Sequence, residues 1–208
     1  DIHRHPELGN REERTGRLVA ERLRAAGLDV RYPVEKTGVV GVLKGGRPGA
    51  VVAVRADLDA LPVEEKRESP YRSENAGVMH ACGHDIHMTT LIGTARVLAQ
   101  LKDKWHGTLV LIGQPAEEVV KGANAMLSDG LYERFPKPDF VIAVHDNASL
   151  AAGTIGVVQG QRGQPPGDRP ARVGLNLPPA PLSARRSRCR RDRSRPRPAA
   201  GAAGPRQR

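Results

Sequence analysis

The chain has 208 residues, enough for one or two domains, and a formal net charge of +10. Residues 162–208 hold 13 arginines, no lysine and two acidic residues, so the first 161 residues carry a net charge of −1. The overall charge therefore says nothing about the binding partner of those first 161 residues. The sequence lacks the run of about 20 apolar residues that a membrane span needs, and we expect no membrane partner.

Residues 162–208 differ from the rest in composition as well as charge. They hold nine of the 17 prolines, one of the two cysteines and no aromatic residue. So little apolar surface cannot offset the entropy lost on ordering, and we expect a disordered tail. Arginine, proline, alanine and glycine are what GC-rich codons give in a shifted frame, so we interpret this tail as a frameshift product. With Cys82 and Cys189 in different regions, we expect no disulfide and a reducing, cytoplasmic location.

Within residues 1–161, helical and strand patterns alternate. A first helix is predicted to start at Asn10, with Glu13 as its capping-box partner, and to end at Gly27. Further helices are predicted at about residues 84–101 and 121–131. Short apolar strands are predicted at residues 28–34, 39–43, 51–54, 109–112, 140–144 and 154–158. This alternation predicts an α/β domain with a mostly parallel or mixed central sheet flanked by helices.

Polar side chains follow three of the predicted strands. Asp57 and Asp59 come after the third strand, Glu117 and Glu118 after the fourth, and His145 at the end of the fifth. In open α/β sheets, ligands bind beyond the carboxyl ends of the strands. The sequence therefore predicts a functional site at this edge of the sheet.

Cys82 and His84 lie at the predicted start of the second helix. Thiolate and imidazole suit Zn²⁺ or a similar divalent ion. Taken alone, so short a motif is more often a buried cysteine beside a surface histidine. His80 and His87 in the same stretch shift the odds toward a metal site. We expect His87, one helical turn after His84, to pack or to support a ligand rather than to bind metal.

The two adjacent glutamates, Glu117 and Glu118, could have different roles. One of Glu117 and Glu118 could bind metal while the other takes a proton from water; a solvated pair at a helix start is the alternative. Asp57 and Asp59 share one face and precede a mostly apolar stretch, where unpaired carboxylates are costly. His145 alone would be an ordinary polar residue at a strand end, and it gains weight only from the other clusters.

Four motifs, in this order, resemble those of the metal-dependent amidohydrolases that include hippurate hydrolases, indole-acetyl amino acid hydrolases and N-acyl amino acid deacylases. They are RADLDALP at residues 55–62, MHACGHDIH at 79–87, GQPAEE at 113–118 and AVH at 143–145. The opening IHRHPEL at residues 2–8 matches too. The resemblance covers about residues 1–161, the N-terminal part of the family's catalytic domain.

The resemblance implies a site with two divalent metal ions, manganese or zinc, or alternatively cobalt or nickel. The implied metal ligands are Cys82, His84, Glu118 and His145, with Cys82 bridging. Glu117 would be the general base and Asp59 would orient the centre. Asp57 stands where related peptidases carry a ligating histidine, so its role stays open. The implied substrate is a small N-acyl amino acid, whose amide bond is hydrolysed.

The resemblance ends after Gly160. Family members continue through a lid or dimerisation domain and then complete the catalytic domain with one more metal-binding histidine. Neither is recognisable in residues 161–208, so we expect no oligomer through that domain and impaired or absent hydrolysis. Two alternatives stay open: a non-catalytic metal-binding pseudoenzyme, and nucleic-acid binding through the arginine-rich tail. The tail has no aromatic side chains for base stacking, which disfavours the second alternative.

Overall fold

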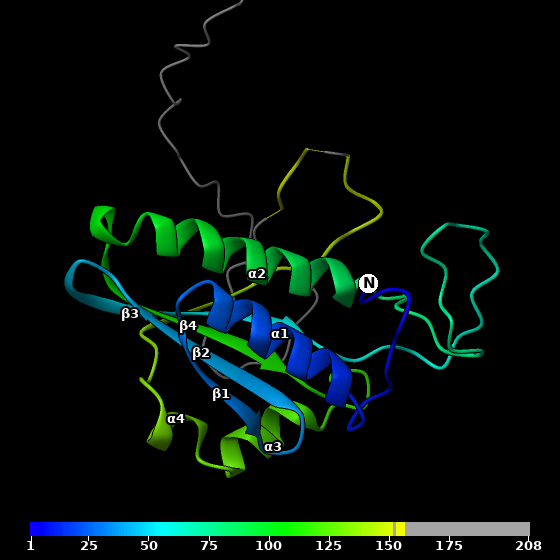
Figure 1. Ribbon diagram of the computed structural model, residues 1–208, viewed down its shortest axis with the longest axis horizontal. Coiled ribbons are helices and arrows are strands. Elements are labelled where there is room, and N and C mark those ends of the chain that lie inside the picture. Colours follow the sequence, from blue (N-terminus) through cyan, green and yellow to red (C-terminus); the bar gives the residue numbers. More distant parts are fainter. Residues whose placement is uncertain (152, 157–208) are drawn as a thin grey trace, which may run out of the picture. The chain divides into compact units, whose positions relative to one another are not determined.

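The computed structural model describes residues 1–151 and 153–156. Residues Asp1–Ser149 form one compact unit, which contains all the helices and strands in the described part of the chain (Figure 1). In chain order these elements are α1 (Glu13–Ala25), β1 (Asp29–Val34), β2 (Gly38–Lys44), β3 (Arg47–Asp57), α2 (His84–Gln100), the 3₁₀ helix η1 (Lys102–Lys104), β4 (His106–Gln114), α3 (Gly122–Ser128), α4 (Leu131–Arg134) and β5 (Phe140–Ala143).

The five strands form one mixed sheet in the order β1-β2-β4-β3-β5. The β1–β2 and β2–β4 pairs are antiparallel, whereas β3 is parallel to both β4 and β5. The antiparallel β1–β2 pair follows from a connection of three residues, which is too short for the crossover that parallel strands need. The predicted α/β class with a mixed sheet is therefore confirmed.

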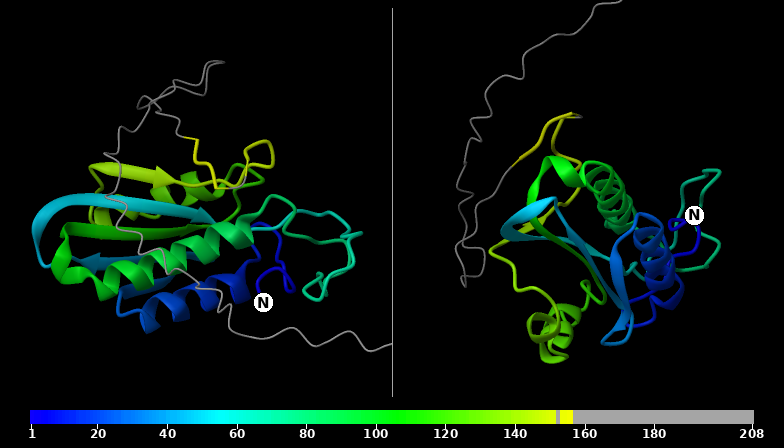
Figure 2. Two further views of the ribbon diagram at one scale, coloured as in Figure 1. Left: turned by 90° about the horizontal axis from the view of Figure 1, so that it is seen from above. Right: turned by 60° about the vertical axis from the view of Figure 1, so that its left-hand side comes forward.

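Helices cover both faces of the sheet. The first face carries α1 and α2, and the opposite face carries α3 and α4 (Figure 2). Side chains of β4 alternate between the two cores: Leu109 and Leu111 pack toward α1 and α2, while Val110 and Ile112 pack toward α3 and α4. Strand β4 is thus buried on both faces at the centre of the sheet.

Two of the predicted helices differ from the observed ones at their boundaries. The predicted N-cap was wrong: Glu12 is at the N-cap position, although its side chain makes no capping hydrogen bond, and Asn10 lies outside the helix with a φ of 65°. Tertiary contacts decide this boundary, because the buried Glu12 accepts hydrogen bonds from Thr37 Oγ1 (2.7 Å) and the Ala116 amide (2.7 Å). The helix expected at residues 121–131 is divided into α3 and α4 at Gly130, which has a φ of 81°.

The end of the described chain also differs from expectation. Residues 154–156 are not in a strand, and the rest of the strand predicted at 154–158 lies outside the described residues, as does the tail 162–208. No helix in the described ranges is both long and apolar enough to cross a membrane. Strand β5 forms an edge of the sheet, and all four of its residues are exposed.

Candidate metal centre

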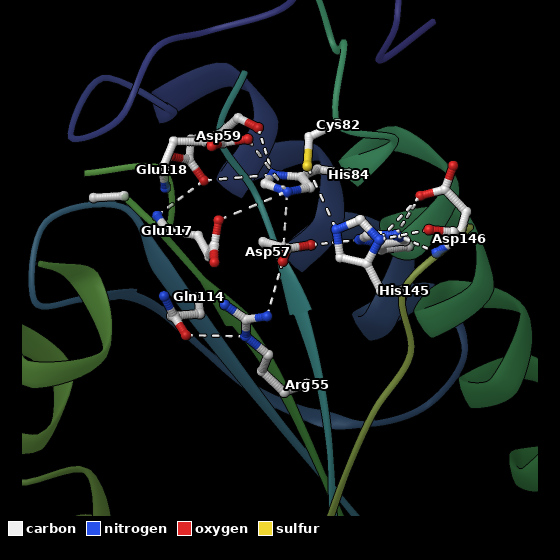
Figure 3. Close-up of polar contacts among 12 residues, drawn as sticks. Arg55, Asp57, Asp59, Cys82, His84, Gln114, Glu117, Glu118, His145 and Asp146 are labelled. Carbon is white, nitrogen blue, oxygen red and sulfur yellow. Dashed lines mark hydrogen bonds and ion pairs between the residues drawn. The ribbon is translucent and has the colours of Figure 1, made fainter. Parts of the chain in front are cut away.

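The predicted site residues converge beyond the carboxyl ends of β3, β4 and β5, beside the start of α2 (Figure 3). Cys82 Sγ lies 3.4 Å from His145 Nε2, across 63 positions in sequence. His84 Nε2 lies 3.7 Å from Glu118 Oε1 and 3.9 Å from Glu117 Oε2. The structure therefore brings these five side chains together.

A glycine between Cys82 and His84 makes their placement possible. Gly83 caps α2 with a φ of 80°, a left-handed conformation that favours glycine. A Cβ atom at this position would also clash with the carboxylate of Asp146. The Cys82–His84 turn and the turn after β5 therefore fit against each other without an intervening side chain.

Asp59 holds two parts of the site. Its carboxylate oxygens accept hydrogen bonds from the amides of Glu117 and Glu118, both at 3.0 Å, and its backbone carbonyl accepts one from His84 Nδ1 at 2.8 Å. Burial raises the pKa of the Asp59 carboxyl, but the contacts with His84 and these amides outweigh it and lower the pKa overall. Asp59 is thus a fixed anion that directs His84 Nε2 toward the two glutamates.

His84 is itself surrounded by negative charge. Burial of the imidazole lowers its pKa, but the hydrogen bond with Asp59 and the charge of Asp57 outweigh burial and raise the pKa. The Cys82 thiol responds in the opposite way: burial, together with Glu118, Glu117 and Asp57, raises its pKa to about 11. A thiolate at this position therefore needs a positive charge beside it.

Two buried atoms show that the residues fit a metal ion. Among the described residues, His84 Nε2 and Glu118 Oε1 are buried side-chain atoms without a hydrogen-bond partner. Such atoms are costly to leave unpaired, and a divalent cation between them would satisfy both. Ligand-type atoms lie within 4.8 Å of one another in four sets among the described residues: Cys82, His84 and His145; His84, Glu117 and Glu118; Asp57, His84 and His87; and His87, His145 and Asp146.

Asp57 already has partners in the structure. Its carboxylate lies 2.8 Å from Arg55 and accepts a 2.6 Å hydrogen bond from His87 Nδ1. Burial raises the pKa of Asp57, but the hydrogen bond from His87 and the charge of Arg55 outweigh it and lower the pKa to about 2. Asp57 is therefore a charged support for His87. Asp146, which contacts His87 in turn, was not predicted, because a lone aspartate after His145 belongs to no motif.

Comparison with known proteins assigns the chain to a family. The chain belongs to the peptidase family M20/M25/M40, whose family model matches residues 53–200. This is a family of hydrolases that includes amidohydrolases and peptidases. The predicted resemblance and the predicted enzyme class are therefore confirmed.

Named relatives are matched over part of their length. A hippurate hydrolase of Campylobacter jejuni is 48% identical over 145 residues, 70% of this chain and 37% of the relative. An N-acyl-L-amino acid amidohydrolase of Geobacillus stearothermophilus is 44% identical over 161 residues, 76% of this chain and 42% of the relative. The chain thus spans about two fifths of the length of these relatives.

Solved structures show the same fold. A Bacillus subtilis protein described as a dinuclear metal-binding peptidase of the M20 family superposes with a TM-score of 0.72 at 40% sequence identity. The match covers 77% of this chain and 44% of that protein. The mixed α/β architecture of this chain is therefore that of M20 peptidases.

Proposed function

We propose that the site binds two divalent metal ions and belongs to an enzyme that hydrolyses the amide bond of small N-acyl amino acids. The observation that supports this most strongly is the pair of unpartnered buried atoms, His84 Nε2 and Glu118 Oε1, 3.7 Å apart beside the contact of Cys82 with His145. Relatives named for N-acyl amino acid hydrolysis support the substrate class.

The proposed ligands are Cys82, His84, Glu118 and His145. Cys82 would hold the ions jointly with His145, whose Nε2 lies 3.4 Å from the Cys82 Sγ. Bound ions would supply Lewis-acid polarisation of the acyl carbonyl and a lower pKa for water at the site. We propose manganese or zinc, with cobalt or nickel as alternatives. Zinc accepts thiolate, imidazole and carboxylate ligands, imidazole suits nickel, and carboxylate suits manganese.

Glu117 is the proposed general base. Asp59 accepts a hydrogen bond from the backbone amide of Glu117 and so fixes it. The Glu117 side chain is 39% exposed, and its Oε2 lies 3.9 Å from His84 Nε2. A carboxylate in this position is held at the site yet remains open to solvent. It can take a proton from water and deliver it to the leaving amine.

Whether the 208 residues alone hydrolyse substrate is proposed separately from metal binding. The chain spans about two fifths of the length of its relatives, and we expect it to bind metal but to hydrolyse substrate slowly or not at all. A cytoplasmic location and the absence of a nucleic-acid partner are likewise proposed. A metal-binding pseudoenzyme is the main alternative function.

A calorimetric titration with Mn²⁺ or Zn²⁺ tests the metal site. We expect the wild-type chain and Glu117→Gln to bind within about three-fold of each other, and Cys82→Ser to bind at least about ten-fold more weakly. Glu133→Gln, at an exposed position on α4, is the matched control and should change nothing. Absence of saturable metal binding by the wild-type chain would show the proposal to be wrong.

Hydrolysis of N-benzoylglycine by the metal-loaded proteins separates enzyme from pseudoenzyme. Any turnover of the wild-type chain should fall at least about 100-fold in Glu117→Gln, because an amide cannot accept a proton at neutral pH. Turnover retained in Glu117→Gln would place the base elsewhere. Metal binding with equal, background turnover in both proteins would favour the pseudoenzyme.

A further inference from the structure

We propose that His87 is a positioning residue that holds His145 at the metal centre through Asp146. This inference rests on the proposed function, in which His145 is a metal ligand. One ring nitrogen of His87 binds Asp57 and the other binds Asp146.

One nitrogen fixes the ring to the sheet. His87 is only 3% exposed, one turn into α2, and its Nδ1 donates the 2.6 Å hydrogen bond to Asp57 Oδ1. Arg55 holds the other oxygen of Asp57 at 2.8 Å and in turn donates to Gln114 Oε1 at 2.9 Å. Side chains from β3 and β4 therefore determine where the His87 ring points.

The other nitrogen reaches the turn that follows β5. His87 Nε2 lies 3.0 Å from the backbone nitrogen of Asp146 and 3.0 Å from Asp146 Oδ1. A neutral ring accepts the hydrogen bond from the Asp146 amide, whereas a protonated ring donates one to the Asp146 carboxylate. In either state, His87 is bound to Asp146.

His145 depends on this contact because packing does not place it. Its side chain is 55% exposed, and it follows a strand whose four residues are all exposed. His145 Nδ1 contacts the carbonyl of Asp146 at 2.7 Å, so the residue that His87 holds also orients the His145 ring. The two imidazole rings themselves lie 4.4 Å apart between centroids.

The contact between Asp146 and Gly83 extends the argument to Cys82. The Asp146 carboxylate occupies the space that a side chain at Gly83 would fill. Since Cys82 precedes this glycine, a fixed Asp146 holds the two turns in register, with Cys82 Sγ 3.4 Å from His145 Nε2. Loss of a residue that orients a metal ligand typically weakens metal binding 10–100-fold.

Two substitutions separate the two hydrogen bonds of His87. An asparagine amide can occupy the place of Nδ1 and keep the contact with Asp57, but it does not reach Asp146. A glutamine amide can occupy the place of Nε2, where it can accept from the Asp146 amide or donate to its carboxylate. We therefore expect His87→Gln to resemble the wild type and His87→Asn to be defective.

Amide hydrogen exchange of the metal-free 208-residue chain is the primary measurement. The Asp146 amide should exchange at least about ten-fold faster in His87→Asn than in the wild type, and within about three-fold of the wild type in His87→Gln. In a Mn²⁺ titration, the affinity should fall at least about ten-fold in His87→Asn and be restored in His87→Gln.

The outcomes distinguish this proposal from the proposed function. Equal Asp146 exchange in all three proteins, or the same defect in both variants, would overturn the positioning role. Loss of the folded circular dichroism signal in both variants would also overturn it, since the ring would then matter for packing. The expected exchange pattern without Mn²⁺ binding by the wild type would support the positioning role and refute the metal site.

Discussion

The Glu117–Glu118 loop and the His145 turn bring side chains to the same place but are held in different ways. The glutamate loop follows β4, the strand buried on both faces. Buried Glu12 accepts a hydrogen bond from Ala116, and Asp59 accepts those of the next two amides. Three consecutive backbone amides are thus bound by the carboxylates of Glu12, at the N-cap position of α1, and of Asp59, two residues after β3.

Among the described residues, the His145 turn is held by contacts of a different kind. It follows β5, whose side chains are exposed. Its described attachments are the pairing of β5 with β3, the contacts of Asp146 with His87 and Gly83, and the contact of His145 with Cys82. The glutamate side of the site is therefore preorganised by the core. The histidine side depends on a few polar contacts, so the two sides should respond differently to mutation.

Among these predictions, replacement of Asp59, which supports the glutamate loop, should cause the largest loss of stability. Asp59→Ala leaves the Glu117 and Glu118 amides without their acceptor, and each hydrogen bond to a charged group contributes about 1.5–3 kcal/mol. We expect a loss of about 3 kcal/mol or more in the free energy of unfolding, measured by urea denaturation with chelator present. Asp29→Ala, at an exposed position, is the control. A loss below about 1 kcal/mol would mean that the loop is held mainly by other contacts.

The same substitution in β4 and β5 should give unequal losses. Ile112 is 5% exposed and Ile142 is 50% exposed. Ile112→Ala should destabilise the fold by about 2–5 kcal/mol, because it removes buried apolar groups and leaves a cavity. Ile142→Ala should lower the unfolding free energy by less than about 1 kcal/mol in the same assay. Equal losses would show that β5 is packed as firmly as β4 and would remove the contrast.

The smallest effect is expected at Glu12, where pH is the informative variable. Burial raises the pKa of this carboxyl, although its hydrogen bonds with Thr37 and Ala116 oppose the shift. The folded state then binds the proton more tightly than the unfolded state, so stability is greatest below the ordinary pKa and falls as pH rises through the raised one. Glu12→Gln can keep both hydrogen bonds, with its amide donating to the Thr37 hydroxyl.

We therefore expect Glu12→Gln to remove this pH-dependent loss while changing stability at acidic pH by no more than about 1 kcal/mol. Urea denaturation between about pH 4 and pH 8 measures the slope. Glu13→Gln, exposed at the next position of α1, should keep the wild-type slope. An unchanged slope in Glu12→Gln would mean that its carboxyl is already ionised throughout this range.

Sequence patterns predicted the elements and the convergence of the site, but not the supports of the site. Cys82, His84 and Glu118 were predictable because motifs and strand ends mark them. Asp146 was not, since its contact with His87 joins residues 59 positions apart and depends on how α2 and β5 pack. Glu12 was missed for the same reason: its partner Ala116 is 104 positions away. Local periodicity does not contain such pairings.

The position of β4 between β2 and β3 has a consequence for biosynthesis. Only Gly45 and Gly46 separate β2 from β3, and the two strands run in opposite directions, the arrangement in which a Gly-Gly turn favours a hairpin. Until residues 106–114 leave the ribosome, β2 and β3 can pair with each other. If that hairpin forms, it must open before β4 can enter between the two strands, because β2 and β3 are not neighbours in the finished sheet.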